Sequence, residues 1–401
     1  MTLPPHTPVV VAARRTPIGT AGHALRDVTV DQLAAVTLRA VANDLAAVGI
    51  SLPPDHVVLG NCMGPGGNVA RVSVLAAGLP LEVPAMTVDL QCGSGLAAVT
   101  TAAALVGSGA ADLVLTGGAE SASTAPWRSW PPEGDDGGGA RRYTRAPFAP
   151  ADVGDPDMGV AADNLARLAG VSRDRQDAYA ARSHERAASA RAAGRFTREL
   201  VPVGGLDRDE RVRSSLDVTT LARLRPAFVD GGTVTAGNSC GVSDGAAVVA
   251  LVSEQVRTGL GLPGLAIHDW AVSGVDPRLP GRGPVPAIST LLQRNEITLD
   301  DIDAIEINEA FAGQVLACCD ELGLDDARVC VEGGALALGH PWGASGAVLL
   351  VRLFSQLVAG SDPAPGAARA ANSTPGRPRL GLAAIAVCGG QGVAALVERV
   401  G

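Results

Sequence analysis

Two segments of the sequence place a nucleophile or a base among small residues. Cys92 follows the apolar run Met86–Leu90 and precedes Gly93-Ser94-Gly95, whose glycines allow a sharp turn into the helical stretch from Leu96. A cysteine at a helix N-terminus meets the positive end of the helix dipole, so we predict a lowered pKa for Cys92. The competing interpretation is a buried, inert thiol, which is the commoner state of a free cysteine.

The histidine at position 340 is a candidate general base. Pro341 disfavours helix at the preceding residue, so His340 is expected in a loop just before the next helix. The chain has only six histidines, and this one stands among glycines near a Ser-Gly helix start. A histidine that merely satisfies the hydrogen bonds of its loop is the alternative.

Two further residues follow predicted strands and could assist such chemistry. Asn308 comes directly after the run Ile302–Ile307, where its amide could donate to a developing oxyanion or orient a water. A helix N-cap is an equally good interpretation of this asparagine. Cys388 follows the last apolar run and could act as an acid or base if its pKa is tuned, whereas an unpartnered thiol would be inert.

The elements that must position these residues are short strands alternating with Ala-rich helices. The predicted strands are Val9–Ala13, His56–Leu59, Ala85–Asp89, Leu113–Thr116, Ala247–Val252, Ile302–Ile307 and Leu382–Val387. Helical periodicity occupies Val30–Val48 and Leu96–Val106. This alternation predicts an α/β fold with a mostly parallel sheet covered on both faces.

Three stretches depart from the alternation, and one pattern is repeated. Residues 121–157 are rich in Gly, Pro, Arg and Trp and predict an excursion from the sheet, which continues into a polar helix over 172–193. Residues 361–378 predict an exposed loop. The stretches 91–97 and 343–348 both place Ser-Gly at a helix start after an apolar element, which suggests two similar halves.

Composition excludes several classes of protein. The formal net charge of −9 argues against nucleic-acid binding. Lys is absent, so all 32 basic residues are Arg, and a Lys Schiff base or a P-loop Lys is excluded. Seven cysteines without a C-x-x-C pair argue against a disulfide framework and a metal site. We expect no signal peptide or membrane segment, and therefore a cytoplasmic protein.

Taken together, the motifs resemble the thiolase family over nearly the whole chain. They are Cys92-Gly-Ser-Gly-Leu, Asn308-Glu-Ala-Phe-Ala, Gly339-His340-Pro-x-Gly-Ala-Ser-Gly and Cys388-Gly-Gly-Gln-Gly, with Arg14–Gly19, Leu224–Phe228, Thr233–Asn238 and Val275–Pro277 between and before them. The resemblance implies two similar α/β domains in a five-layered α-β-α-β-α arrangement. We expect an N-terminal domain at 1–265, with a loop domain inserted at about 119–246, and a C-terminal domain at 266–401.

The resemblance also implies acyl transfer between coenzyme A thioesters, with no metal or redox cofactor and with a homodimer or homotetramer as the assembly. Cys92 would become acylated, His340 would activate it, and Asn308 would help His340 stabilise the oxyanion of the second substrate through a water. The backbone N–H of Cys92 would serve the other oxyanion. Acyl-CoA and CoA are then the partners, without nucleic acid or membrane.

Matching positions imply the residues that contact CoA. They are Met158, Arg213, Phe228, Ala236, Cys240 and Phe311. Arg213 is the natural cation for the nucleotide phosphates in a chain without Lys. Cys240 replaces a residue that is often Ser near the pantetheine, and Asp157 precedes Met158 where His is frequent.

The C-terminal motif departs from the family pattern. Aligned without gaps, Ala386 occupies the position of the proton-transferring Cys, and Cys388 falls on a Gly whose N–H contributes to an oxyanion hole. A two-residue shift along a strand moves a thiol by about 6.6 Å, so the loop must compensate. Three interpretations stay open: Cys388 removes the α-proton, His340 takes over that step, or the acyl group goes to another acceptor. A non-catalytic partner subunit is a further alternative.

Overall fold

The computed structural model describes residues 3–50, 53–132, 139–359 and 379–401. The expected exposed loop at 361–378 and six residues of the 121–157 excursion lie outside the described residues. The strands are β1 (Pro8–Arg15), β2 (Gly19–Thr20), β3 (His56–Gly60), β4 (Ala85–Val88), β5 (Leu113–Ser121), β6 (Arg128–Trp130), β7 (Arg141–Tyr143), β8 (Ser243–Ser253), β9 (Gly264–Gly274), β10 (Ala304–Ile307), β11 (Leu380–Val387) and β12 (Gln391–Val400).

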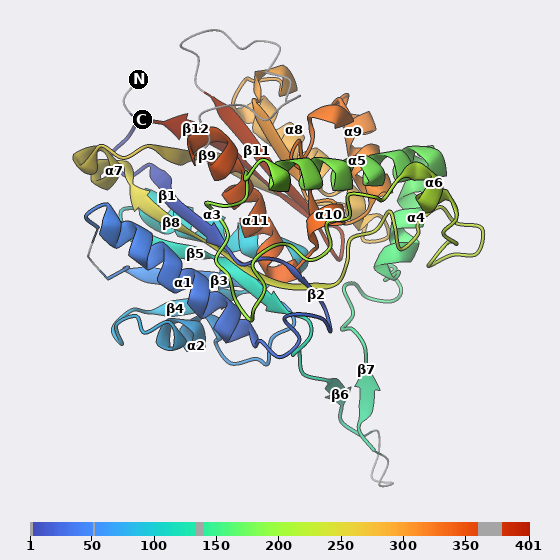
Figure 1. The fold of residues 1–401 in the computed structure, drawn as a ribbon, viewed down its shortest axis with the longest axis horizontal. Coiled ribbons are helices and arrows are strands. Elements are labelled where there is room, and N and C mark those ends of the chain that lie inside the picture. Colours follow the sequence, from blue (N-terminus) through green and yellow to red (C-terminus); the bar gives the residue numbers. More distant parts are fainter. Residues whose placement is uncertain (1–2, 51–52, 133–138, 360–378) are drawn as a thin grey trace.

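The helices alternate with these strands through most of the chain (Figure 1). They are α1 (Val30–Ala47), α2 (Val69–Ala76), α3 (Ser94–Gly107), α4 (Met158–Leu168), α5 (Arg173–Ala192), α6 (Val218–Ala222), α7 (Glu254–Leu260), α8 (Pro284–Arg294), α9 (Ala312–Leu322), α10 (Ala335–Leu338) and α11 (Trp342–Phe354). A single 3-10 turn, η1 (Gln91–Gly93), leads into α3. All seven predicted strands and both predicted helices are therefore present.

One continuous sheet runs through both halves of the chain, in the order β10-β11-β12-β9-β1-β8-β5-β3-β4, with β2 beside β8. The prediction of a mostly parallel sheet is wrong. Parallel pairing is confined to β3 with β4 and β5, and to β10 with β11. The other pairs are antiparallel: β11 turns directly into β12, and β8 runs opposite to β5 after the long excursion. The predicted buried strand before Cys92, β4, is instead a half-buried edge strand.

Three apolar clusters explain the layering. One cluster lies between α1, α2 and the N-terminal half of the sheet, and another lies between α8, α9 and the C-terminal half. The third contains α3 and α11 and the inner faces of both halves, since α11 contacts β5 and β8 on one side and β10 and β11 on the other. The result is five layers of helix and sheet, with α3 and α11 in the middle (Figure 1).

The two middle helices approach each other so closely that glycine is required at the contact. A Cβ atom on Gly346 of α11 would lie 2.4 Å from the backbone nitrogen of Leu96 in α3. A Cβ atom on Gly95 would lie 2.8 Å from the carbonyl oxygen of Gly343. The repeated Ser-Gly pattern of the sequence is therefore the place where the two halves of the chain meet.

The excursion between β5 and β8 forms a separate group of elements. It holds the short ribbon of β6 and β7, which projects from the body, and the helices α4, α5 and α6 (Figure 1). The predicted helix over 172–193 is α5, and it packs against α9 and α10 of the C-terminal half. The excursion is thus fastened to the half of the chain that carries Asn308 and His340.

One stretch, Trp342–Ala359, has the length and hydropathy of a membrane span. It consists of α11 and the turn after it, and 67% of it is buried inside the protein. The central position of α11 between the two halves of the sheet accounts for its apolar character, so it is a core helix.

Replacing Gly346 by Ala is expected to destabilise the protein, because the added methyl group meets backbone that cannot move aside. Overpacking of this kind costs about 1–3 kcal/mol. The matched control is Gly107→Ala at the other end of α3, where a Cβ meets nothing within 4 Å, so that stability stays the same or rises slightly. Urea unfolding followed by circular dichroism measures both variants, and equal midpoints would contradict the prediction.

Candidate active site

Cys92 lies in the 3-10 turn η1 directly before α3, where the sequence placed it. The turn is tight, and Gln91 adopts a left-handed φ of 47°. Ser94 closes the turn, since its hydroxyl donates to the carbonyl of Gln91 at 2.6 Å and accepts from the N–H of Leu90 at 2.8 Å. Cys92 itself is half-buried in this turn.

Cys388 reaches Cys92 in spite of the altered motif. The two sulfur atoms are 3.8 Å apart. Strand β11 ends at Val387, and Cys388 begins a three-residue turn in which Gly389 and Gly390 both have left-handed φ values, of 78° and 82°. The thiol stands two residues later in this sequence than in the family pattern, and this turn changes the path of the backbone to compensate for that shift. It brings a thiol from position 388 to the place next to the nucleophile.

The close approach of the two sulfurs determines how they ionise. The hydrogen bond with Cys388, together with burial, raises the pKa of Cys92, whereas the same hydrogen bond lowers the pKa of Cys388. The predicted lowering of the Cys92 pKa by the helix dipole is therefore wrong for the free protein. The two thiols therefore ionise as a pair. When one proton has left the pair, the S–H that remains on Cys92 donates to the thiolate of Cys388 and stabilises it.

His340 is held through its other ring nitrogen by a serine. The Nδ1 atom of His340 and the Oγ atom of Ser345 are 2.6 Å apart, and the same hydroxyl lies 3.0 Å from the carbonyl of Pro341. A hydroxyl carries one proton. When it donates to Pro341, it accepts from Nδ1–H and leaves Nε2 as a free base. When it donates to Nδ1, Nε2 carries the proton and becomes a donor.

The Nε2 atom of His340 faces Asn308. The amide nitrogen of Asn308 lies 3.5 Å from Nε2, and both residues are buried. Burial lowers the pKa of His340 to about 4, so the imidazole is neutral at physiological pH. The N-cap interpretation of Asn308 is wrong, because the N-cap of α9 is Phe311. His340 and Asn308 thus form a second pair beside the pair of thiols.

A buried carboxylate ties the two pairs together. Glu120, at the end of β5, accepts hydrogen bonds from the backbone N–H of Gly343 at 3.0 Å, of Met63 at 3.1 Å and of Cys62 at 3.2 Å. It therefore fixes the start of α11, which follows His340, to the strand ends of the N-terminal half. Since α11 also contacts the turn η1, the His340 loop and the Cys92 turn lie side by side.

Three of the expected CoA contacts are close to one another. The ring of Phe228 packs on Gly159, next to Met158, where a Cβ would lie 2.1 Å from the ring. Phe228 is 45% exposed and meets Phe311 edge to face, with ring centroids 6.1 Å apart. Phe311 in turn directly precedes α9 in the Asn308 motif. These aromatic rings offer an apolar surface beside the catalytic pairs.

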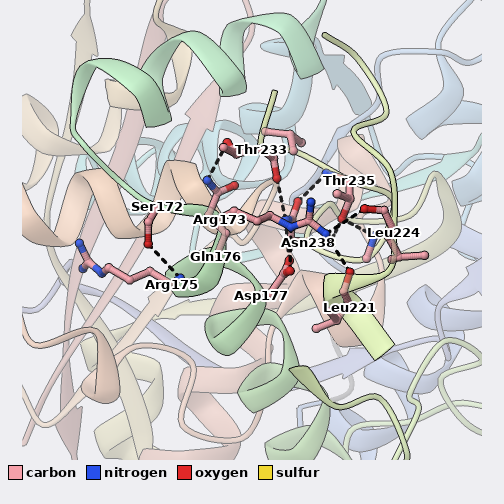
Figure 2. Close-up of polar contacts among 12 residues, drawn as sticks. Ser172, Arg173, Arg175, Gln176, Asp177, Leu221, Leu224, Thr233, Thr235 and Asn238 are labelled. Atoms are coloured by element: carbon pink, nitrogen blue, oxygen red, sulfur yellow. Dashed lines mark hydrogen bonds and ion pairs between the residues drawn. The ribbon is translucent and has the colours of Figure 1, made fainter. Parts of the chain in front are cut away.

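Ala236 and Cys240 belong to one rigid segment. Asn238 between them donates to Asp177 of α5 at 2.9 Å and accepts from the N–H of Thr235 at 2.8 Å (Figure 2). Ala236 is exposed at the tip of this turn, whereas Cys240 is half-buried and donates its N–H to the carbonyl of Ala310 at 2.9 Å. The turn is therefore fixed against the Asn308 motif.

The polar network of Figure 2 also fixes the segment that carries Phe228. Arg173 of α5 donates to the carbonyls of Leu221 and Leu224, and it pairs with Asp177 at 2.7 Å. Gln176 donates to the hydroxyl of Thr233 at 2.9 Å (Figure 2). One helix thus holds both ends of the segment 221–238.

Arg213 is exposed, and its backbone N–H donates to Nδ1 of His184 at 3.2 Å. Asp157 is also exposed and is the N-cap position of α4, directly before Met158. The structure therefore places Arg213 on the surface of the excursion, with its backbone bonded to α5.

Comparison with known proteins decides the family. The thiolase N-terminal domain model matches residues 8–255, and the thiolase C-terminal domain model matches residues 262–399. The chain belongs to the thiolase family. The division that we predicted at residue 265 is not tested by these matches and stays a prediction.

Relatives of this thiolase are similar over most of their length. YhfS of Bacillus subtilis, provisionally named an acetyl-CoA C-acetyltransferase, is 43% identical over 86% of this chain and 90% of its own. VraB of Staphylococcus aureus, with the same provisional name, is 42% identical over 86% of this chain and 92% of its own. The crystal structure of the Bacillus anthracis acetyl-CoA acetyltransferase has a TM-score of 0.87 and 35% identity, covering 98% and 99% of the two chains.

Sequence reasoning missed two residues that shape the site of this thiolase. Ser345 was seen only as part of a repeated pattern, although its position five residues after His340 in a helix start is the signal for a bond to the ring. Glu120 lies near the end of an apolar strand, where a lone acid gave no signal of its five hydrogen-bond donors. They lie in the loop after β3, on Asn61, Cys62 and Met63, and at the start of α11, on Gly343.

Replacing Ser345 by Ala is expected to slow acylation of Cys92 about tenfold to a hundredfold, because Nδ1 of His340 loses its partner and general-base catalysis weakens. The affinity for acetyl-CoA should stay unchanged. Rapid-quench mass spectrometry measures the acylation rate. The control is Thr101→Ala on α3, whose hydroxyl bonds only to the carbonyl of Ala97. A slower rate in both variants, or in neither, would argue against a positioning role for Ser345.

His184 is expected to lower the free energy of unfolding in mild acid. Burial, with smaller effects from Arg211 and Arg213, lowers its pKa from 6.5 to about 4. Between these values the unfolded chain binds a proton that the folded chain does not, so stability falls as the pH drops from 6.5 towards 4. His184→Gln removes this effect and should gain about 2 kcal/mol on the parent protein between pH 7 and pH 5. Urea unfolding at both pH values checks this, and parallel curves would refute it.

Proposed function

We propose that this thiolase is an acyl-CoA C-acyltransferase that makes or cleaves 3-ketoacyl-CoA through an acylated Cys92. The observation that carries the proposal is the distance of 3.8 Å between the sulfurs of Cys92 and Cys388, beside the pair formed by His340 and Asn308. A nucleophile, a neighbouring acid–base group and a buried imidazole are the groups that two-step acyl transfer requires. The names of the relatives, acetyl-CoA C-acetyltransferases, support it.

The first step forms the acyl-enzyme. Nε2 of His340 takes the proton of Cys92, and the sulfur attacks the thioester carbonyl of an acyl-CoA. The bond between the carbonyl carbon and the CoA sulfur breaks, and CoA leaves with the proton from His340. The backbone N–H of Cys92 stabilises the oxyanion during this step. The neutral imidazole that burial maintains is the form that can act as the base.

The second step forms the carbon–carbon bond. The thiolate of Cys388 removes an α-proton from acetyl-CoA, and the carbanion attacks the acyl carbonyl on Cys92. The sulfur of Cys92 is expelled and takes the proton from Cys388, so a 3-ketoacyl-CoA leaves and the pair returns to a Cys92 thiol beside a Cys388 thiolate. Acylation also removes the S–H of Cys92 that stabilised this thiolate. The thiolate of Cys388 therefore becomes more basic in the step in which it must remove a proton from the α-carbon of acetyl-CoA.

Two residues would stabilise the enolate of the second substrate. With its proton on Nε2, His340 is a donor, and Asn308 Nδ2 lies beside it, so both can act on the same oxygen directly or through a water. Cys388 stands where the family has a glycine that supplies an oxyanion-hole N–H. We infer that this residue combines that backbone role with the thiol chemistry that relatives place two residues earlier.

Further parts of the proposal concern binding and assembly. CoA would lie along Phe228, Phe311 and the segment that ends at Cys240, with Met158 beneath it and Arg213 at the rim. No metal or redox group is proposed, and the chain would act as a homodimer or homotetramer in the cytoplasm. The acyl chains that it accepts, and a place in lipid metabolism, belong to this proposal as well.

Replacing Cys388 by Ala separates the two steps. The variant should still acquire one acetyl group from acetyl-CoA, whereas Cys92→Ala should acquire none. Condensation in Cys388→Ala should fall by about a hundredfold to ten-thousandfold, the usual range for loss of an acid–base group. Intact-protein mass spectrometry and assay of acetoacetyl-CoA measure the two steps, and Cys319→Ala in the core of α9 is the matched control.

Each other outcome favours a different interpretation. Full condensation in Cys388→Ala would remove Cys388 from the mechanism and transfer its step to His340. An acetylated wild-type protein that condenses nothing would favour transfer to another acceptor. Absence of any acetyl group on the wild-type protein would favour a non-catalytic subunit.

A further inference from the structure

An arginine beside the catalytic segments has a buried donor with no partner. The Nε atom of Arg211 is buried, and none of the described residues accepts a hydrogen bond from it. No salt bridge joins Arg211 to a carboxylate in the described parts of the chain. Burying an N–H of a charged group without an acceptor is costly, so an arrangement like this one favours an anion that completes it.

Arg211 differs from the fully buried arginines in having no ion pair within the described residues, although Nε of Arg352 also has no hydrogen-bond partner there. Arg15 pairs with Glu199 and Asp209, Arg352 pairs with Glu199 and Glu332, and Arg257 pairs with Glu254. The chain has 41 acidic residues and a net charge of −9, so carboxylates are plentiful. Within the described parts of the chain, Arg211 nevertheless pairs with none of them.

The position of Arg211 connects it with the catalytic site. Its guanidinium occupies the space over Gly241, where a Cβ would lie 2.4 Å from Nη1. The carbonyl of Gly241 accepts the backbone N–H of His340 at 3.2 Å, and the preceding residue, Cys240, donates its N–H to Ala310. Arg211 therefore covers the strip of backbone that lies between the His340 loop and the Asn308 motif.

The surroundings of Arg211 are positive. Arg213 follows two residues later. The neighbours His184 and Cys240 carry no negative charge at neutral pH, because burial lowers the pKa of His184 to about 4 and raises that of Cys240 to about 12. Burial lowers the pKa of Arg211 itself, Cys240 raises it, and Arg213 lowers it. Arg211 is half-buried, so its Nη atoms are within reach of a ligand.

We propose that Arg211 binds an anionic oxygen group of the thioester substrate, and so makes an anion subsite next to Cys240. This inference rests on the proposed function. The planar fork of a guanidinium matches a carboxylate or a phosphate. The group is either a carboxylate at the far end of the acyl chain or a phosphate of CoA, and the two sources predict different selectivity.

Equilibrium binding in a Cys92→Ala background tests this without any acyl transfer. Isothermal titration calorimetry measures the affinities for succinyl-CoA, butyryl-CoA, 3′-dephospho-CoA and CoA. They are compared between the Cys92→Ala protein with Arg211 intact and the same protein carrying Arg211→Met or Arg211→Lys. The control is Arg208→Met, an exposed arginine on the same segment. Thermal unfolding confirms that each variant is folded, and Arg211→Lys preserves the charge if Arg211→Met does not fold.

The inference predicts a loss of about tenfold to a hundredfold in affinity on Arg211→Met, the range for a hydrogen bond to a charged group. If the anion is an acyl carboxylate, only succinyl-CoA loses affinity, and butyryl-CoA binds as before. If it is a CoA phosphate, all the CoA ligands weaken together, and removal of the 3′-phosphate shows which phosphate is bound.

Unchanged affinity of Arg211→Met for every ligand would overturn the inference, and so would an equal loss in Arg208→Met. The proposed function is tested separately, by acetylation of the wild-type protein. If the wild-type protein is not acetylated but Arg211→Met loses affinity as expected, the proposed function is refuted and the subsite is not. If the wild-type protein is acetylated but Arg211→Met keeps its affinity, only the subsite is refuted.

Discussion

The site depends on the close crossing of α3 and α11. The backbone of Gly346 approaches that of Leu96 more closely than any side chain allows, and Gly95 meets the Gly343 carbonyl in the same way. This contact brings the start of one helix, with Cys92 before it, against the start of the other, with His340 before it. Glu120 then secures the start of α11 to the strand ends of the first half through the Gly343 N–H. Both catalytic pairs therefore rest on a junction between the two halves of the chain.

The parts of the fold that could be predicted are those that local pattern determines. Apolar runs such as Val9–Ala13 and helical periodicity such as Val30–Val48 appear in the structure as β1 and α1. Strand β9 escaped prediction because its second half, from His268 onward, mixes polar and apolar residues on a partly exposed strand. The direction of a strand after a long connection is not fixed by that connection, and β8 returns antiparallel to β5 after the long excursion. Spacing along the chain carries no information about such a return.

For the site, the sequence suggested which groups to examine, but not how those groups ionise. Cys92 and His340 stand in patterns that a strand, a glycine turn and a helix start explain. The pKa of Cys92 is set by a thiol 296 residues away in the sequence, so a rule based on the helix dipole alone gave the wrong direction. The place of Cys388 was uncertain for the same reason, since it depends on a turn with two left-handed glycines. No sequence motif marked Arg211, because its distinguishing feature is the lack of a hydrogen-bond acceptor for Nε among the described residues.

The excursion leaves and rejoins the sheet at neighbouring positions. Ser121 at the end of β5 is paired with Asp244 near the start of β8, and Ser123 donates to that same carboxylate. The segment between them carries Met158, Arg211, Phe228 and Cys240, while Cys92, Asn308, His340 and Cys388 all lie outside it. All of the proposed reacting groups and most of the proposed CoA contacts, Phe311 excepted, therefore lie in separate stretches of the gene. A cassette cut at these paired residues could be exchanged between relatives to alter selectivity while the reacting groups stay as they are.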